Sequence, residues 1–181
     1  MNTKAFTYAI VVGLLTTSWA WGADTQSQSA KQSRVSVTFI KPEAFTDAKD
    51  SMMGSDRELA GILDEIREHL GQIVDRYIPK EQHLDLKITN IDMAGDFEPW
   101  SGPQAQDVRI IKEIYPPRID LEFRLTDSTG KMIKEGSREL RDMSFLMKPQ
   151  LRLSSLERLP YEKELLVDWL RSEFGDPLKS K

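Results

Sequence analysis

The chain has 181 residues, no cysteine and a formal net charge of −4 at pH 7. This acidic balance disfavours binding to nucleic acid, which needs a clustered basic surface. The absence of cysteine from the sequence excludes disulfides, thiol nucleophiles, iron–sulfur clusters and thiolate zinc sites. The length suits a single domain that is stabilised by packing alone.

Residues 1–23 show the pattern of a cleavable signal peptide. Lys4 supplies the positive charge at its start, and the apolar run at 5–15 is shorter than the roughly 17–25 residues that span a membrane. The small residues at 18–20 (SWA) form the best cleavage motif, with 20–22 (AWG) as the alternative. We therefore expect export to the periplasm and no transmembrane segment after cleavage.

We predict a flexible N-terminus at 24–33, a single α+β domain at 34–175 and a C-terminal tail at 176–181. The segment 24–33 is polar and contains few apolar residues, which is typical of a disordered end. Residues 34–40 (RVSVTFI) alternate between apolar and polar side chains, and this pattern predicts the first strand of the domain.

The first helix is predicted to begin at Ser55, because Ser55 and Glu58 have the spacing of a capping box. Apolar residues then recur at helical spacing from Leu59 to Tyr77, and Pro79 marks the end. Burying such a stripe contributes about 1.5–3 kcal/mol for each large side chain. We therefore expect this helix to lie on a sheet.

Three further strands are predicted. Residues 84–93 (LDLKITNIDM) form one of them, with a bulge near Asn90, where the apolar phase shifts. Residues 119–126 and 131–141 form a hairpin around a turn with the sequence DSTG. The apolar segment 108–114 is soon followed by two prolines, so the chain should bend there or run along an edge.

The last helix is predicted to begin near Pro160, which suits a first turn, and to end at Gly175, which suits a C-terminal stop. The order of the elements is then β-α-β-β-β-α. We predict an α+β fold with one mostly antiparallel sheet of about four or five strands and two main helices packed on one face.

The densest group of polar and acidic side chains follows the second strand and comprises Asn90, Asp92, Asp96 and Glu98. A calcium loop does not fit, because two positions that need ligands hold Ala94 and Ser101. A strand end followed by a turn at Gly95 explains the group without any chemistry. His69 has no second ligand at helical spacing, and His83 precedes a strand. We predict no catalytic residue, no metal site and no cofactor.

Two segments carry candidate recognition residues. The loop after the second strand places Phe97 and Trp100 among prolines and glycines, and loop aromatics can act as recognition anchors. The segment 143–159 combines apolar side chains such as Phe145 with basic ones such as Arg152, a pattern that suits a partner or an anionic ligand. Each segment also has a simpler interpretation, in which it folds back and covers the core.

Five short motifs occur in order along the chain: Pro42-x-x-Phe45-Thr46-Asp47, Asp92-Met93-Ala94-Gly95, Asp107-Val108-Arg109, Tyr161-Glu162-Lys163 and Asp168-Trp169. In their order and spacing they resemble the exported bacterial proteins catalogued as domain of unknown function 3016. The resemblance covers roughly residues 34–174, consistent with one domain of this length. It implies an envelope protein without an assigned activity, and it carries over no catalytic residue.

The leading hypothesis is a soluble periplasmic module that binds another component of the cell envelope, such as a protein. Its candidate binding residues are Asp92, Phe97, Trp100, Arg109, Phe145 and Arg152. The alternative is a hydrolase of an envelope polymer that uses Asp92 with Asp96 or Glu98. It requires these carboxylates to meet in a cleft beside Arg109. A small-molecule or lipid carrier is the third hypothesis, and it requires an enclosed apolar cavity.

Overall fold

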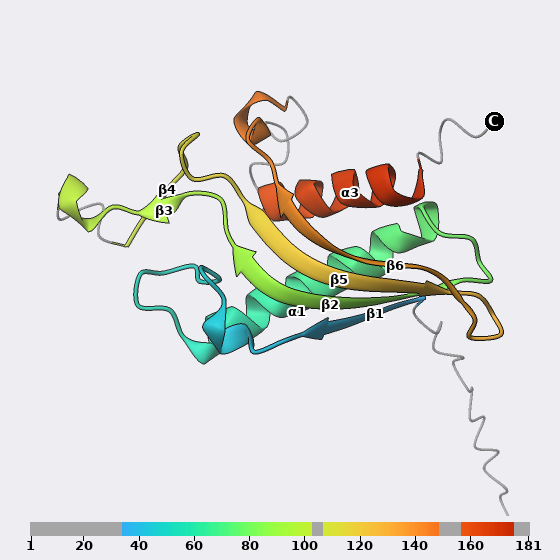
Figure 1. Ribbon diagram of the computed structural model, residues 1–181. Coiled ribbons are helices and arrows are strands. Elements are labelled where there is room, and N and C mark those ends of the chain that lie inside the picture. The colour runs from blue at the N-terminus through green and yellow to red at the C-terminus, as the bar shows by residue number, and fades with distance from the viewer. Residues whose placement is uncertain (1–33, 103–106, 149–156, 176–181) are drawn as a thin grey trace, which may run out of the picture. The chain divides into compact units, whose positions relative to one another are not determined.

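The computed structural model describes residues 34–102, 107–148 and 157–175, which all belong to one compact unit (Figure 1). The predicted signal peptide, flexible N-terminus and C-terminal tail lie outside these residues. The strands are β1 (Val35–Phe39), β2 (His83–Asp92), β3 (Asp96–Phe97), β4 (Arg109–Ile110), β5 (Arg118–Thr126) and β6 (Met132–Arg141). The helices are α1 (Asp56–Ile73) and α3 (Pro160–Phe174), with the short 3₁₀ helices η1 (Pro42–Ala44), η2 (Val74–Arg76), η3 (Pro99–Ser101) and η5 (Phe145–Met147).

Four strands form the main sheet in the order β1-β2-β5-β6. β1 runs parallel to β2, and the other two pairs are antiparallel. β3 and β4 pair with each other in a separate two-stranded sheet. The structure confirms the α+β class, the mostly antiparallel main sheet and the order of its elements.

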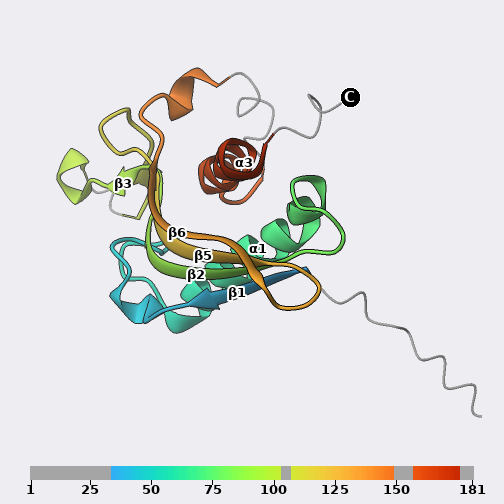
Figure 2. The same ribbon diagram turned by 45° about the vertical axis from the view of Figure 1, so that its right-hand side comes forward.

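Both helices cover the same face of the main sheet (Figure 2). On that face, alternate residues of the two central strands are buried, among them Leu86 on β2 and Leu121 on β5. They belong to one hydrophobic core with Ile66 of α1 and Leu166 of α3. The residues between them, such as Lys87, stay exposed on the other face. One buried and one open face explain the alternating pattern of the sequence.

β2 contains the predicted bulge, because its register with β5 shifts between Ile88 and Asn90. Before the bulge the even-numbered residues up to Ile88 are buried, whereas after it Ile91 is buried instead. Since successive side chains of a strand point to opposite faces, the bulge turns Asp92 away from the core. It therefore determines which way the Asp92 carboxylate points.

α1 begins at the predicted cap. Ser55 Oγ accepts a hydrogen bond of 3.2 Å from the backbone N–H of Glu58. The Glu58 carboxylate accepts hydrogen bonds of 3.0 and 3.2 Å from Ser51 Oγ. The second half of the capping box is thus replaced by a contact with the preceding loop.

α3 has the predicted ends. It begins with Pro160, and it stops before Gly175, whose φ of 97° suits glycine. Within the described residues, no helix is both long and apolar enough to cross a membrane.

The apolar segment 108–114 bends as its following prolines suggest. Of this segment only the two residues of β4 pair with another strand, β3. The backbone N–H of Tyr115 then donates 3.0 Å to the carbonyl of Lys112, which closes a turn. The two prolines follow this turn directly and lead into β5, so the segment does not join the main sheet.

The segments after β1, β2 and β6 and before β5 lie at one end of the main sheet, opposite the β5–β6 turn. In the strand register, Asp92 lies opposite Arg118, and Arg118 lies opposite Arg141. The segments that follow β2, precede β5 and follow β6 therefore emerge at the same end, and so does the segment after β1, which is parallel to β2. This end is named the loop end and comprises the described segments 40–55, 93–102, 107–117 and 142–148 (Figure 1).

Candidate functional site

Asp47 and Arg109 form a bidentate ion pair at the loop end, although 62 positions separate them in the chain. Arg109 Nη1 lies 2.8 Å from Asp47 Oδ2, and Nη2 lies 3.1 Å from Oδ1. The exposed fractions of these side chains are only 14% for Asp47 and 13% for Arg109. Arg109 also donates to the carbonyls of Gly95 at 2.9 Å and Lys49 at 2.6 Å. One guanidinium thus joins the loop after β1, the turn after β2 and β4.

The backbone of Asp47 pairs with the end of β2. Its N–H donates 3.0 Å to the carbonyl of Ile91, and its carbonyl accepts 3.0 Å from the N–H of Met93. This isolated bridge sets Asp47 beside Asp92 in the direction of the sheet. The loop after β1 therefore extends the edge of the sheet by one residue and places a second carboxylate next to Asp92.

The turn at Gly95 leads from β2 into β3, which pairs with β4. Gly95 has a φ of 81°, and a Cβ atom there would lie 2.8 Å from the carbonyl oxygen of Ile110. Both the backbone conformation and the close approach require glycine. The Phe97 ring is buried, with its centroid 4.6 Å from Arg109 Cζ, so the guanidinium also makes a cation–π contact.

Glu162 connects α3 to the same turn. Its Oε1 accepts a hydrogen bond of 2.7 Å from the N–H of Ala94, and the residue is only 2% exposed. Burial raises the pKa of Glu162, whereas hydrogen bonds from backbone N–H groups and the charge of Arg109 oppose the rise. The network around Arg109 thus includes a buried carboxyl group with a raised pKa.

We expect Glu162 to make the stability of the protein depend on pH. Its folded pKa lies above the usual value of about 4.3, so the native state keeps this proton to a higher pH than the unfolded chain does. The contribution of Glu162 to the free energy of unfolding is therefore full below the usual pKa and falls as the pH rises towards the folded pKa. Urea unfolding at a series of pH values measures this slope.

Glu162→Gln should flatten that slope, because the amide oxygen still accepts from Ala94 but does not ionise. Glu81→Gln, at an exposed glutamate, is the matched control and should leave the slope unchanged. An equal slope in Glu162→Gln and the unaltered chain would contradict the raised pKa.

Glu98, which follows β3, is bound to residues of the segment after β4 and does not line the cleft. Its carboxylate accepts hydrogen bonds from Lys112 Nζ at 2.6 and 2.7 Å and from Tyr115 Oη at 3.1 Å. Glu98 is buried, which suits a carboxylate that is held by internal partners. The pairing of Asp92 with Glu98 that one version of the hydrolase hypothesis required is therefore absent from the described residues.

An open cleft of about 340 Å³ lies at the loop end, between the loop after β1, the end of β2, β3 and the segment before β5. Its charged lining residues are Asp47, Lys49, Asp92, Asp96 and Arg118. Arg118 Nε lies 3.7 Å from Asp92 Oδ2, and both side chains are partly exposed. Burial raises the pKa of Asp92; Arg118 opposes the rise, whereas Asp47 and Asp96 add to it.

The structure separates the two predicted loop aromatics. Trp100, in η3, is 72% exposed, so it does not fold back onto the core. Phe97, three residues earlier, is buried under Arg109 and supports the fold. Asp92 lies in the cleft, and Arg109 lies just behind it, bound to Asp47. Arg152 lies outside the described residues.

Phe145 requires a correction. It was a candidate for an exposed binding patch, but it is 1% exposed and packs edge-on against the Tyr161 ring, with the centroids 5.0 Å apart. The simpler interpretation, in which this part of the segment covers the core, is the one that the structure supports. An apolar side chain in an irregular segment gains most by burial.

Three residues of the site were not among the predicted binding residues: Asp47, Arg118 and Glu162. Asp47 and Glu162 belong to the motifs quoted for the family resemblance, and that was their only signal in the sequence. Arg118 lies directly opposite Asp92 in the strand register, which becomes apparent only when β2 and β5 are paired. Among the described residues, no three acidic or histidine side chains are placed to hold a metal ion.

Comparison with protein-family models decides the family. The model described as "Protein of unknown function (DUF3016)" matches residues 33–172, which is most of the chain. The chain belongs to the DUF3016 family. No curated protein and no solved structure matches it.

In this DUF3016 protein four of the five motifs that carried the resemblance meet at one place. Arg109 of the third motif binds both Asp47 of the first and the carbonyl of Gly95 of the second. Glu162 of the fourth motif binds Ala94 of the second. Segments that are far apart in the sequence thus build a single hydrogen-bonded network behind the cleft.

Proposed function

We propose that this DUF3016 protein is exported to the periplasm and acts there as a soluble binding module for a protein of the cell envelope. The observation that carries the proposal is a cleft with a loosely paired Asp92 and Arg118, set among exposed apolar side chains at the loop end. The signal-peptide pattern of residues 1–23 supports the compartment.

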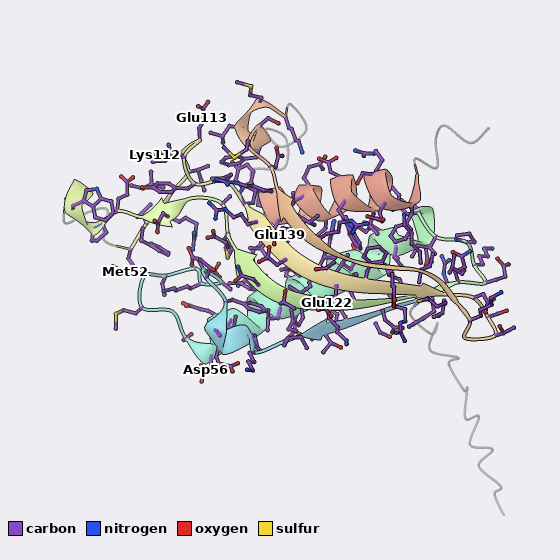
Figure 3. All side chains as sticks on the ribbon, viewed as in Figure 1. Met52, Asp56, Lys112, Glu113, Glu122 and Glu139 are labelled. Carbon is purple, nitrogen blue, oxygen red and sulfur yellow. The ribbon has the colours of Figure 1, made fainter. Side chains whose placement is uncertain are left out.

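Most of the large apolar side chains that stay exposed in the described residues belong to the loop end. They are Ile40, Met52, Met53, Trp100, Val108, Ile111, Ile114, Met143 and Met147. Figure 3 shows Met52 and Lys112 at this end, whereas Glu122 and Glu139 lie along the strands. Exposed apolar groups that are gathered in this way mark a surface for another protein, and methionine adapts to the shape of a partner.

The charged side chains of the cleft can exchange their contact with each other for contacts with a partner protein. The Asp47–Arg109 and Glu98–Lys112 pairs are short and held in internal networks. In contrast, Asp92 and Arg118 are 3.7 Å apart and partly exposed, so a partner's polar groups can replace their contact at little cost. Trp100, three residues after the cleft-lining Phe97, provides an exposed aromatic side chain of the kind that dominates binding energy at interfaces.

Photo-crosslinking in living cells tests the proposal. A photoreactive residue at position 100 or 114 should yield a discrete adduct with one envelope protein, because Ile114 lines the cleft and both side chains are exposed at the loop end. The adduct should be recovered from the periplasmic fraction, and the chain in it should begin at Trp21 or Ala23. Asp92→Asn should reduce the adduct, because it removes a charge from the cleft.

Position 124, on the open face of the sheet and away from the loop end, is the matched control and should yield no such adduct. The proposal fails if the same adduct forms at position 124, if it resists Asp92→Asn, or if the chain stays in the cytoplasm with residues 1–23 attached.

A hydrolase of an envelope polymer is the second candidate, and the environment of Asp92 favours it. A carboxyl group with a raised pKa in a cleft beside Asp96 has the character of a general acid. This function replaces the first if the chain releases soluble fragments from isolated envelope polymer and Asp92→Asn does not.

A further inference from the structure

The two edge strands of the main sheet differ in charge. β6 carries Lys134, Glu135, Arg138 and Glu139 along its length, whereas β1 has the sequence VSVTF and no charged residue. An exposed strand edge offers unpaired backbone groups to any other strand, and charged side chains are a common protection against this. β6 carries such charges along its length, whereas β1 carries none beside Val37 and Phe39.

Two cations of β6, Lys134 and Arg138, are held on its helix-facing side. Lys134 Nζ and Arg138 Nε lie 2.6 and 2.8 Å from the carboxylate of Glu173 on α3. Arg138 also lies over the ring of Phe123, at 5.2 Å from its centroid. A strand that docked on β6 would meet these fixed cations on one side and two glutamates on the other.

The backbone of β1 points alternately towards β2 and away from it. The carbonyl of Arg34 accepts 2.9 Å from the N–H of Leu84, and the N–H of Ile40 donates 2.9 Å to the carbonyl of Ile88. The backbone N–H and C=O groups of the even-numbered residues of β1 therefore point towards β2. Those of Val37 and Phe39 point away from it. In the described residues, the sheet has no further strand on that side.

The side chains of β1 are self-complementary about Thr38. Ser36 and Thr38 are exposed on the open face, whereas Val37 and Phe39 are only half-buried against the core. In an antiparallel pair centred on Thr38, each Thr38 faces the other, and each Val37 faces a Phe39. Hydroxyl pairs and aromatic–branched pairs of this kind stabilise neighbouring strands.

We propose that two copies of this chain associate through β1 in this antiparallel register, so that their main sheets join into one continuous sheet. Val37 and Phe39 exchange backbone hydrogen bonds with Phe39 and Val37 of the second copy. No like charges oppose each other, and the half-exposed apolar side chains of both copies become covered. A dimer with twofold symmetry is the commonest homo-oligomer, and its interface uses the same surface of both copies, here the edge formed by β1.

The natural absence of cysteine allows a direct test by crosslinking of the chain recovered from cells that express the full sequence. In this register the two Thr38 residues form a non-hydrogen-bonded pair with Cα atoms about 4.5 Å apart, which suits a disulfide. Thr38→Cys should therefore form a covalent dimer under mild oxidation. Ser36→Cys is the matched control, because its two copies would be separated by about 13 Å along the strands and should stay unlinked.

Sedimentation provides the second measurement. Val37→Pro removes an N–H that points away from β2, so it should spare the fold and shift the mass from two chains to one. Ser137→Lys places a charge on the opposite edge and should leave the dimer intact. The proposal is overturned if the unaltered chain sediments as a single chain, if Ser36→Cys links as readily as Thr38→Cys, or if Ser137→Lys abolishes the dimer while Val37→Pro does not.

Discussion

Replacing Arg109 with alanine is expected to lower the free energy of unfolding by about 3–5 kcal/mol. The change leaves the Asp47 carboxylate buried without its partner, and it removes the donor from the carbonyls of Gly95 and Lys49. It also exposes the buried ring of Phe97. Urea unfolding followed by circular dichroism measures the loss directly.

Two further variants make this expectation specific. Arg118→Ala removes an arginine of the same end of the sheet, but its pairing with Asp92 is long and partly exposed, so we expect a cost of about 0–1 kcal/mol. The double variant with Asp47→Ala should lose less than the sum of its single changes, because no unpaired charge remains. If Arg109→Ala costs no more than Arg118→Ala, the ion pair is not a structural anchor.

Phe145→Ala is expected to cost about 3–5 kcal/mol, the range for removing a large aromatic side chain from a core. Phe145, the first residue of η5, is buried and meets the Tyr161 ring edge-on, with the centroids 5.0 Å apart. The substitution leaves a cavity between the segment after β6 and the first turn of α3. Thermal and urea unfolding should therefore both shift markedly, whatever the protein binds.

Met147→Ala is the matched control, because Met147 lies in the same 3₁₀ turn and is 74% exposed. Its stability should change by less than about 0.5 kcal/mol. The buried position of Phe145 is refuted if Phe145→Ala unfolds at the same urea concentration as Met147→Ala. The pair of variants thus separates a core residue from a surface residue within one turn of backbone.

Several elements could be predicted from the sequence because short-range interactions determine them. Ser55 begins α1 by accepting from Glu58, only three residues away. The hairpin turn forms because Asp127 Oδ1 accepts from the N–H groups of Thr129 and Lys131 at 2.8 and 3.0 Å. The bulge near Asn90 was also predictable, since the change of apolar phase is local to β2.

The candidate site could be predicted only in part. Asp92 and Arg109 were candidates, but the partners that define their roles come from distant segments: Asp47 from the loop after β1, Arg118 from β5 and Glu162 from α3. No periodicity relates positions such as 47 and 109, because side-chain patterns report only on neighbours along one helix or strand. Their encounter depends on the strand order and on the bulge.

Which individual loop residues are buried could not be predicted from the sequence for the same reason. Phe97 and Trp100 have similar composition around them, yet one lies under Arg109 and the other is exposed. The sequence by itself determined the two helices, the four strands of the main sheet, their order and the face that each of these strands buries, because these follow from local hydrogen bonds and apolar spacing. Only the tertiary structure decided which charges became internal anchors and which remained in the cleft, because burial and pairing depend on contacts between segments that are distant in the chain.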